Sequence, residues 1–236
     1  MMLKEIQYGM ETIQFDLQYR DKKHMTINVL PDMNVEVVAP RDWGINVINE
    51  RVRKRARWIL KQKQYFLEFL PKQPPREYVS GETHMYRGRQ YRLRLKKSEY
   101  DEVRLKGGFF EVKTTDKDNK DHNRALLYQW YKDSATKVFY PMLDHWIEKL
   151  RKYDIASPVL EIRIMTKRWG SCIASKGKVI LNLELNKAPT HCIEYILVHE
   201  LCHLKYPSHD KEFYNFMSKV MPDWKGKKER LEKAFL

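Results

Sequence analysis

Cysteine and long apolar runs are scarce in this chain of 236 residues. Three cysteines are too few, and odd in number, to form a disulfide framework. The longest uninterrupted apolar run is about four residues, from Tyr195 to Val198, whereas a transmembrane helix needs roughly 20. The first residues, up to Asp16, contain no apolar core of a secretory signal. We therefore expect a cytoplasmic protein that makes no membrane contact.

Glycine, proline and acidic residues are also limited. Nine glycines and ten prolines exclude a collagen-like or low-complexity chain, and an aromatic content of 12% excludes a disordered one. Lysine and arginine outnumber aspartate and glutamate by 45 to 31, which gives a formal charge of +14. Residues 51–100 alone hold 15 basic and 4 acidic side chains. Any anionic partner is therefore expected to bind through this segment.

The spacing of apolar residues predicts an α+β fold with a β-rich N-terminal region. A helix begins after Asp42 and runs to about Leu70, where a group of prolines ends it. Elsewhere in the first 116 residues, apolar and polar side chains alternate with the period of a half-buried strand. The strand-like stretches are 13–19, 25–29, 35–38, 91–95 and the glycine-turn hairpin 103–112.

A polar stretch at residues 116–122 is the best candidate for a domain boundary. It separates the strand-rich region from a region with helical spacing, which starts at about Asn123. The sequence therefore predicts a β-rich basic domain in residues 1–116 and a second domain in residues 117–236.

The second domain is predicted to place a β-hairpin between helices. Helical spacing continues to about Tyr153, with a kink or break at Pro141. One strand of the hairpin contains Ile162 and Ile164, and the other covers residues 179–183. Two further helices follow, and their expected N-caps are Thr190 and Ser208.

Residues 199–203 form an H-E-x-x-H motif in an apolar, helical context. His199 and His203 are four residues apart, so both imidazoles lie on one helix face and can bind a single zinc ion. Glu200 can take a proton from a zinc-bound water, whose pKa falls from about 15.7 to about 7, and later deliver it to a leaving group. The alternative interpretation is a pair of core histidines that form hydrogen bonds inside a buried helix.

A catalytic zinc site needs a third protein ligand beside its water. His209 lies six residues after His203, and the break at Pro207 permits the chain to turn back toward the helix. The close spacing favours His209 over the carboxylate alternatives, which are Glu212, Glu229 and Glu232.

The motif belongs to a wider pattern of residues. Trp-Gly-Ser-Cys at 169–172 and Leu181-Asn182 precede His-Glu-Leu-Cys-His at 199–203 and the later His209. In the N-terminal half, the pattern includes Arg57-Trp58-Ile59, Ser80-Gly81-Glu82 and residues 86–92. With these residues the chain resembles the YgjP-like family of zinc metallopeptidases, which is related to the SprT-like and WLM groups of zincins. The resemblance covers nearly the whole chain.

The resemblance implies a zinc-dependent hydrolase of the metallopeptidase class, acting on a peptide or protein. It implies a small zincin-like domain in which a β-hairpin packs on the H-E-x-x-H helix, with His199, His203 and His209 as ligands and Glu200 as general base. By analogy, the strand within residues 178–185 would pair with an extended peptide. Candidates for contacts with the substrate or the transition state are Arg163, Arg168, Trp169, Tyr195 and Tyr206.

Two other functions remain open on the same residues. A metal site beside arginines and lysines suits a pyrophosphatase that hydrolyses a nucleotide phosphoanhydride. A basic module with a structural metal could instead bind nucleic acid, through the phosphate backbone and with steep salt dependence. The cations on the helix after Asp42 are the first candidates for such contacts, although a solvated charged face is the simpler interpretation.

The three cysteines are expected to be small buried hydrophobic residues, because free cysteine is usually buried. Cys192 and Cys202 have only this interpretation. For Cys172, a zinc ligand and a reactive thiol are the alternatives.

Overall fold

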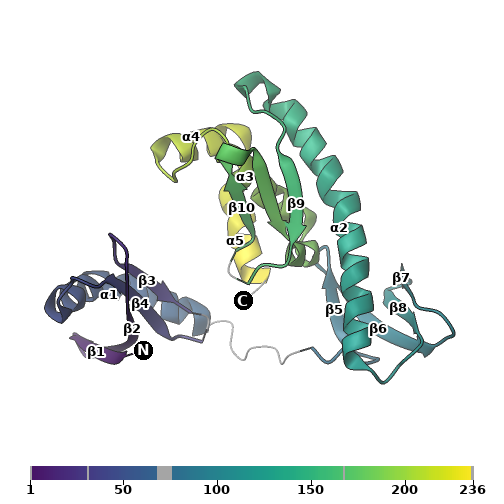
Figure 1. Cartoon of the computed structure of the whole chain (residues 1–236), viewed down its shortest axis with the longest axis horizontal. Coiled ribbons are helices and arrows are strands. Elements are labelled where there is room, and N and C mark those ends of the chain that lie inside the picture. Colours follow the sequence, from purple (N-terminus) through teal and green to yellow (C-terminus); the bar gives the residue numbers. More distant parts are fainter. Residues whose placement is uncertain (1, 31, 68–75, 167, 235–236) are drawn as a thin grey trace. The chain divides into compact units, whose positions relative to one another are not determined.

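The residues that the computed structural model describes are 2–30, 32–67, 76–166 and 168–234. They form an α+β protein of helices and small mixed sheets, as the sequence predicts (Figure 1). The chain divides into two compact units, residues 1–74 (unit 1) and 75–235 (unit 2), each with its own buried core. In the described ranges, no helix combines the length and the apolar character that crossing a membrane requires.

Unit 1 forms a four-stranded sheet that packs against one helix. Ile13, Phe15 and Leu17 point to the helix side of their strand and are buried, and α1 buries Ile48 and Val52 in return. The predicted end of this helix near Leu70 lies outside the described residues. The sheet order is β1-β2-β4-β3, with β2 and β4 parallel. The elements are β1 (Met2–Tyr8), β2 (Glu11–Arg20), β3 (Thr26–Val29), β4 (Val35–Pro40) and α1 (Ile45–Leu67).

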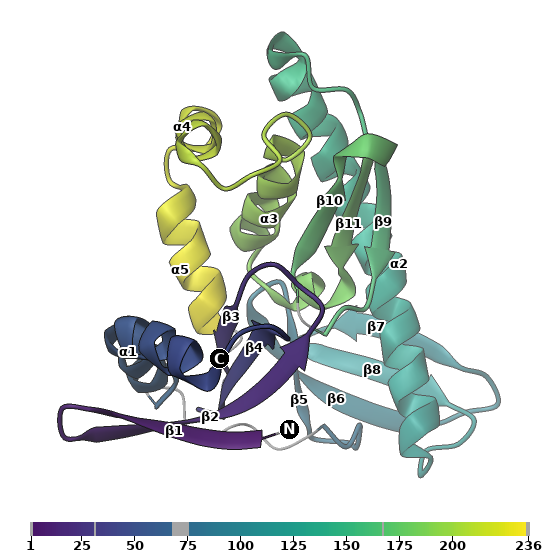
Figure 2. The same ribbon diagram turned by 60° about the vertical axis from the view of Figure 1, so that its left-hand side comes forward.

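Unit 2 begins with a second four-stranded sheet, in the order β5-β6-β8-β7. Leu93 and Leu95 of β6 are buried, whereas Arg92, Arg94 and Lys96 are exposed, so the predicted alternation of apolar and basic side chains is confirmed. The long helix α2 contacts β7 and β8 and continues to β9 of the next sheet (Figure 2). The elements are β5 (Thr83–Tyr86), β6 (Arg89–Lys97), β7 (Glu102–Lys106), β8 (Phe109–Thr114) and α2 (Lys120–Leu150).

The predicted domain boundary after residue 116 differs from the division into units, because it lies inside unit 2, between β8 and α2. The polar residues there serve the start of the helix. Asn119 is the N-cap of α2 and accepts a hydrogen bond from the backbone N–H of His122 at 3.0 Å. The Asn123 side chain donates to the carbonyl of Lys117 at 2.9 Å. Pro141 lies inside α2, which is a single helix rather than two.

The second sheet of unit 2 has three strands in the order β10-β11-β9. The prediction of a hairpin between the Ile162 strand and residues 179–183 is wrong, because β9 and β11 pair in parallel. The antiparallel partner of β11 is β10, a four-residue strand without an alternating pattern. The suspected substrate strand at residues 178–185 is therefore central, and β10 lies at the edge. The strands are β9 (Val159–Arg163), β10 (Gly170–Ile173) and β11 (Lys178–Asn182).

Three helices complete unit 2 after the short 3-10 helix η3. The predicted N-caps are wrong by one or two residues. Pro189 precedes α3 without a side-chain cap, and Asp210 rather than Ser208 caps α4, where its Oδ1 accepts from the backbone N–H of Phe213 at 2.9 Å. The elements are η3 (Leu183–Lys187), α3 (Thr190–Cys202), α4 (Lys211–Val220) and α5 (Trp224–Ala234).

The turn between β5 and β6 holds the start of α3 in place. The backbone N–H of Arg87 donates to the carbonyl of Asn186 at 3.0 Å, and that of Gly88 to the carbonyl of Lys187 at 2.9 Å. Gly88 has a φ of +78°, and a Cβ there would lie 2.7 Å from Cγ of Pro189. Glycine therefore permits both the turn and the close approach that fixes the beginning of the helix.

Candidate metal centre

The helix α3 presents two histidines on the same face. His199 lies in its last turn, and His203 follows directly as the C-terminal cap. Because i and i+4 residues face the same side of a helix, the two side chains converge, with ring centroids 4.9 Å apart. The other faces of α3 are anchored in the core of unit 2 by buried residues that include Ile196, Leu197 and Leu201.

His209 completes a cluster of three imidazoles. It lies in the loop between α3 and α4, and its Nε2 is 2.9 Å from Nε2 of His199 and 3.0 Å from Nε2 of His203. One ligand atom from each histidine lies within 4.8 Å of the others. Three nitrogens that face one point in this way match the donor set of a catalytic metal site with three protein ligands.

The hydrogen bonds and burial of these rings suit metal binding. His203 Nδ1 donates to the carbonyl of Tyr206 at 2.9 Å, so its Nε2 keeps a lone pair for a metal. Burial, followed by the charges of His203 and His209, lowers the pKa of His199 to about 3. Burial also lowers the pKa of His209. Since neutral imidazole is the form that binds a metal, the residues fit a metal ion.

Phe213 forms the apolar support of the cluster. This fully buried ring lies 5.0 Å from His199, 4.6 Å from His203 and 4.9 Å from His209, measured between ring centroids. Phe213 lies in the helix predicted after Ser208, and the sequence predicts no contact between it and the histidines. No local spacing pairs it with the third histidine, because His209 lies in the loop before α4.

A second set of aromatic rings connects His209 with His199 around one side of the cluster. Tyr214 stacks on His209 at 6.2 Å and on Trp224 at 5.5 Å. Trp224 stacks on Tyr195 at 6.5 Å, and Tyr195 meets His199 edge to face at 5.9 Å. Burial raises the pKa of Tyr195 above its usual range, so its hydroxyl stays protonated. The Tyr195 ring thus lies beside the cluster, and its contact with a substrate stays a prediction.

Glu200 is buried in α3 next to His199, with 6% of its surface exposed. Burial raises the pKa of its carboxyl group to about 7, against the opposing charge of Arg168. The backbone of β10 passes close to it, because a Cβ on Gly170 would lie 2.6 Å from Oε1 of Glu200. The glycine of the Trp-Gly-Ser-Cys motif thus leaves room for this carboxylate.

The loop before β10 is held by Asn182, a residue of the Leu-Asn pair for which the sequence predicts no role. The Asn182 side chain donates to the carbonyls of Met165 at 2.7 Å and Arg168 at 2.8 Å. Its backbone N–H donates to the carbonyl of Trp169 at 2.9 Å. A buried asparagine at the end of a strand was the available signal, because such a residue must find several hydrogen-bond partners.

The other predicted contact residues take different positions. The exposed Arg168 acts on Glu200 through its charge, and the half-buried Trp169 packs on the core of unit 2. Tyr206 contributes its backbone carbonyl to His203, while its ring lies 5.3 Å from Phe216. Arg163 forms an ion pair with Glu161.

The alternative metal ligands lie outside the cluster, which among the described residues consists of the three histidines. Glu229 pairs with Lys233 at 2.7 Å and Glu232 with Lys228 at 3.8 Å, while Glu212 is exposed. Burial raises the pKa of Cys172 to about 11, so this thiol stays protonated. Cys192 and Cys202 are buried, as predicted.

Three histidine nitrogens around one point, with a buried glutamate beside them, form a donor set that fits a metal-dependent hydrolase. Residues 23–234 match the model of the YgjP-like family, described as a YgjP-like metallopeptidase domain. The match covers most of the chain, which therefore belongs to the YgjP-like family of metal-dependent hydrolases.

One comparison with solved structures finds the metallopeptidase zymogen abylysin of Pyrococcus abyssi. The identity is 24%, the match covers 40% of this chain and 91% of that one, and the TM-score is 0.36. The comparison with curated proteins finds no match.

Proposed function

We propose that this protein is a zinc-dependent peptidase in which His199, His203 and His209 hold the metal. The proposal rests on the short distances from Nε2 of His209 to the Nε2 atoms of His199 and His203, and on the burial of Glu200 beside these rings. Three neutral nitrogen ligands are typical of catalytic zinc sites. Zinc bound there supplies a Lewis acid that lowers the pKa of water and polarises a carbonyl group.

Glu200 is the proposed general base. As a carboxylate it accepts the proton of the attacking water, and as a carboxylic acid it returns this proton to the amine that leaves. Burial raises the pKa of this carboxyl group toward neutral pH, which favours proton exchange, whereas a cation at the three histidines would oppose this shift. Burial, which raises that pKa, also keeps bulk water away from the carboxyl group.

The proposed binding surface for a peptide is the edge strand β10. Among the described strands β10 pairs only with β11, so its other edge offers backbone N–H and C=O groups. Gly170 brings this edge close to Glu200. A peptide that adds to the edge as an extended strand would gain affinity from backbone hydrogen bonds with little demand on its sequence.

The test compares Glu200→Gln with Glu212→Gln in a peptide-library cleavage assay. Elemental analysis measures bound zinc in each variant. Loss of the general base should lower kcat by roughly 10²- to 10⁴-fold, while zinc remains bound. Glu212 is an exposed carboxylate on α4, so its substitution should leave both cleavage and zinc content unchanged.

Wild-type turnover in zinc-loaded Glu200→Gln would contradict the role of Glu200. A parallel panel of nucleoside triphosphates tests the substrate class. Release of pyrophosphate without any peptide cleavage would show that the site is a phosphoanhydride hydrolase instead.

A further inference from the structure

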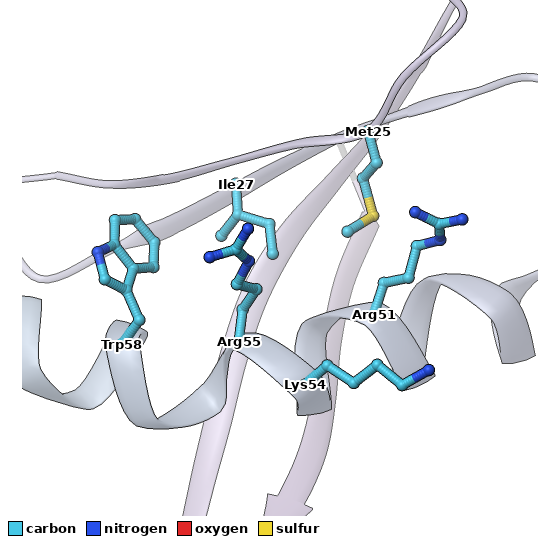
Figure 3. Close-up of a pocket in the computed structure, with 6 residues that line it drawn as sticks. All are labelled: Met25, Ile27, Arg51, Lys54, Arg55 and Trp58. Carbon is cyan, nitrogen blue, oxygen red and sulfur yellow. The ribbon is translucent and has the colours of Figure 1, made fainter. Parts of the chain in front are cut away.

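Unit 1 contains a cavity of about 380 Å³ that plays no part in the metal centre (Figure 3). This volume lies within the range of sites that bind small ligands, roughly 300–1,000 Å³. One wall belongs to α1 and the other to β3 and the residue before it. We call this cavity the α1–β3 groove, and its lining consists of Met25, Ile27, Arg51, Lys54, Arg55 and Trp58.

The α1 wall places three cations and one aromatic ring along one helix face. Arg51 is followed by Lys54 and Arg55 at i+3 and i+4 and by Trp58 at i+7, and such positions share a face. The side chains of Arg51, Arg55 and Trp58 stand in this order and face Met25 and Ile27 (Figure 3). Because the helix rises about 1.5 Å per residue, the backbone positions of the three cations span about 6 Å along the helix axis.

The charge of this face is largely uncompensated. Between residues 45 and 67 the helix carries seven basic side chains and one acidic one, Glu50. Glu50 pairs with Lys54 at 2.7 Å, and the guanidinium of Arg51 lies over the ring of Trp43 at 4.4 Å. Arg55 has no acidic partner among the described residues. The groove therefore favours a ligand with several closely spaced negative charges.

Trp58 supplies a second kind of contact. Its side chain is 40% exposed, although tryptophan is mostly buried in folded proteins. Met25 and Ile27 on the opposite wall are half-buried and pack on the core of unit 1. A flat, apolar group could stack on the indole ring while the adjacent guanidinium groups bind its anionic neighbours.

We propose that the α1–β3 groove binds single-stranded nucleic acid. The nucleobase stacks on Trp58, and the flanking phosphates bind Arg51, Lys54 and Arg55. A nucleic-acid strand alternates flat rings with phosphates and carries one charge per nucleotide, which matches both walls. Arginine forks bind phosphate oxygens in pairs. An acidic peptide would need contiguous carboxylates next to an aromatic residue to present the same chemistry.

The test measures the binding of labelled oligo(dT) and oligo(rU) to the full chain by fluorescence anisotropy. Each oligonucleotide has about 12 nucleotides, because single-strand binding sites cover roughly 4–16 nucleotides. Trp58→Ala should weaken binding by roughly 5- to 100-fold, as expected for a lost stacking contact, and Trp58→Phe should restore most of it. Arg55→Ala should reduce the slope of log K against log salt concentration by about 0.7.

The matched control is Arg57→Ala, which removes an exposed cation of the same helix that does not line the groove. It should change affinity much less than Arg55→Ala. Equal losses at the two positions, together with an unchanged affinity in Trp58→Ala, would show diffuse attraction by the whole helix and overturn the proposal.

Two other ligands are tested in the same assay. Tighter binding of an acidic, tyrosine-containing peptide than of either oligonucleotide would assign the groove to a protein partner. Tighter binding to vesicles that contain phosphatidylserine would assign it to a membrane surface. A difference between oligo(dT) and oligo(rU) tells which nucleic acid is preferred. The groove and the metal centre lie in different units, so these outcomes do not depend on peptidase activity.

Discussion

At the scale of single residues, the candidate site depends on a close approach that only glycine allows. Gly170 of β10 faces the carboxyl group of Glu200, and any Cβ there would overlap with it at 2.6 Å. The carboxyl group cannot retreat freely, because it is buried on a helix that is itself packed in the core. The position of Gly170 thus links the packing of unit 2 to the placement of the proposed general base.

Replacing Gly170 with alanine should therefore displace Glu200. Overpacking of this kind costs roughly 1–3 kcal/mol of unfolding free energy. We also expect lower kcat in peptide cleavage, since a displaced carboxyl group no longer meets the attacking water. Urea denaturation and single-turnover cleavage measure the two effects.

The matched control for this prediction is Gly226→Ala in α5. A Cβ at Gly226 meets nothing within 4 Å, and alanine in a helix interior is favoured over glycine by roughly 0.5–1 kcal/mol. This variant should be as stable as the wild type or more so. Wild-type stability and cleavage in Gly170→Ala would show that the approach to Glu200 has no consequence.

At the scale of secondary-structure elements, the loop between α3 and α4 carries the third histidine. Asp210 follows His209 directly and caps α4 through its bond to the backbone N–H of Phe213. The same bond fixes Phe213, whose ring supports all three imidazoles. A single N-cap thus orients both a proposed ligand and its apolar support.

Loss of this cap should weaken metal binding as well as stability. Asp210→Ala removes the acceptor oxygen, which costs roughly 0.5–2 kcal/mol of unfolding free energy. We expect a several-fold loss of zinc affinity, because His209 is then less well positioned. Competition with a chromogenic chelator measures that affinity.

Asp210→Asn is the control, because asparagine keeps a side-chain oxygen that caps equally well. Its zinc affinity should stay close to that of the wild type. If Asp210→Ala lost stability but kept full zinc affinity, the loop would hold His209 without help from the cap.

The sequence predicted those elements whose side chains repeat in a regular pattern. The alternation in β2 and β6 and the i, i+4 spacing of His199 and His203 each follow from local geometry. β10 was missed because its four residues are all half-buried and show no period. The support by Phe213 and the stack of Tyr214, Trp224 and Tyr195 were missed because their rings come from three helices, which only the tertiary fold brings together.

At the scale of the whole molecule, the basic segment is shared between two separate units. Of the 15 basic residues in 51–100, seven lie on α1 in unit 1 and seven lie between residues 76 and 97 in unit 2. Composition alone could not show this division, since it follows from the contacts that each part makes. Three of the seven α1 cations, Arg51, Lys54 and Arg55, line the α1–β3 groove, and the basic face of β6 belongs to the unit that carries the candidate metal centre.

Separate cores predict separate unfolding transitions. Unit 1 buries residues from Ile6 to Ile59 and unit 2 buries residues from Leu93 to Leu231, so calorimetry of the full chain should resolve two steps. The proposed metal site lies in unit 2, so free zinc at 100 times its dissociation constant should add about 2.7 kcal/mol to the stability of that unit. Chelation should therefore lower the midpoint of one step and leave the other unchanged.

A core substitution in unit 1 provides the converse test. Val52 is fully buried in α1, and its replacement by alanine should lower only the step that chelation leaves unchanged. Added zinc should then not restore that step, because the lost packing lies in the unit without the three histidines. A single transition that responds to both chelation and Val52→Ala would mean that the two cores unfold together, and the assignment of independent units would have to be abandoned.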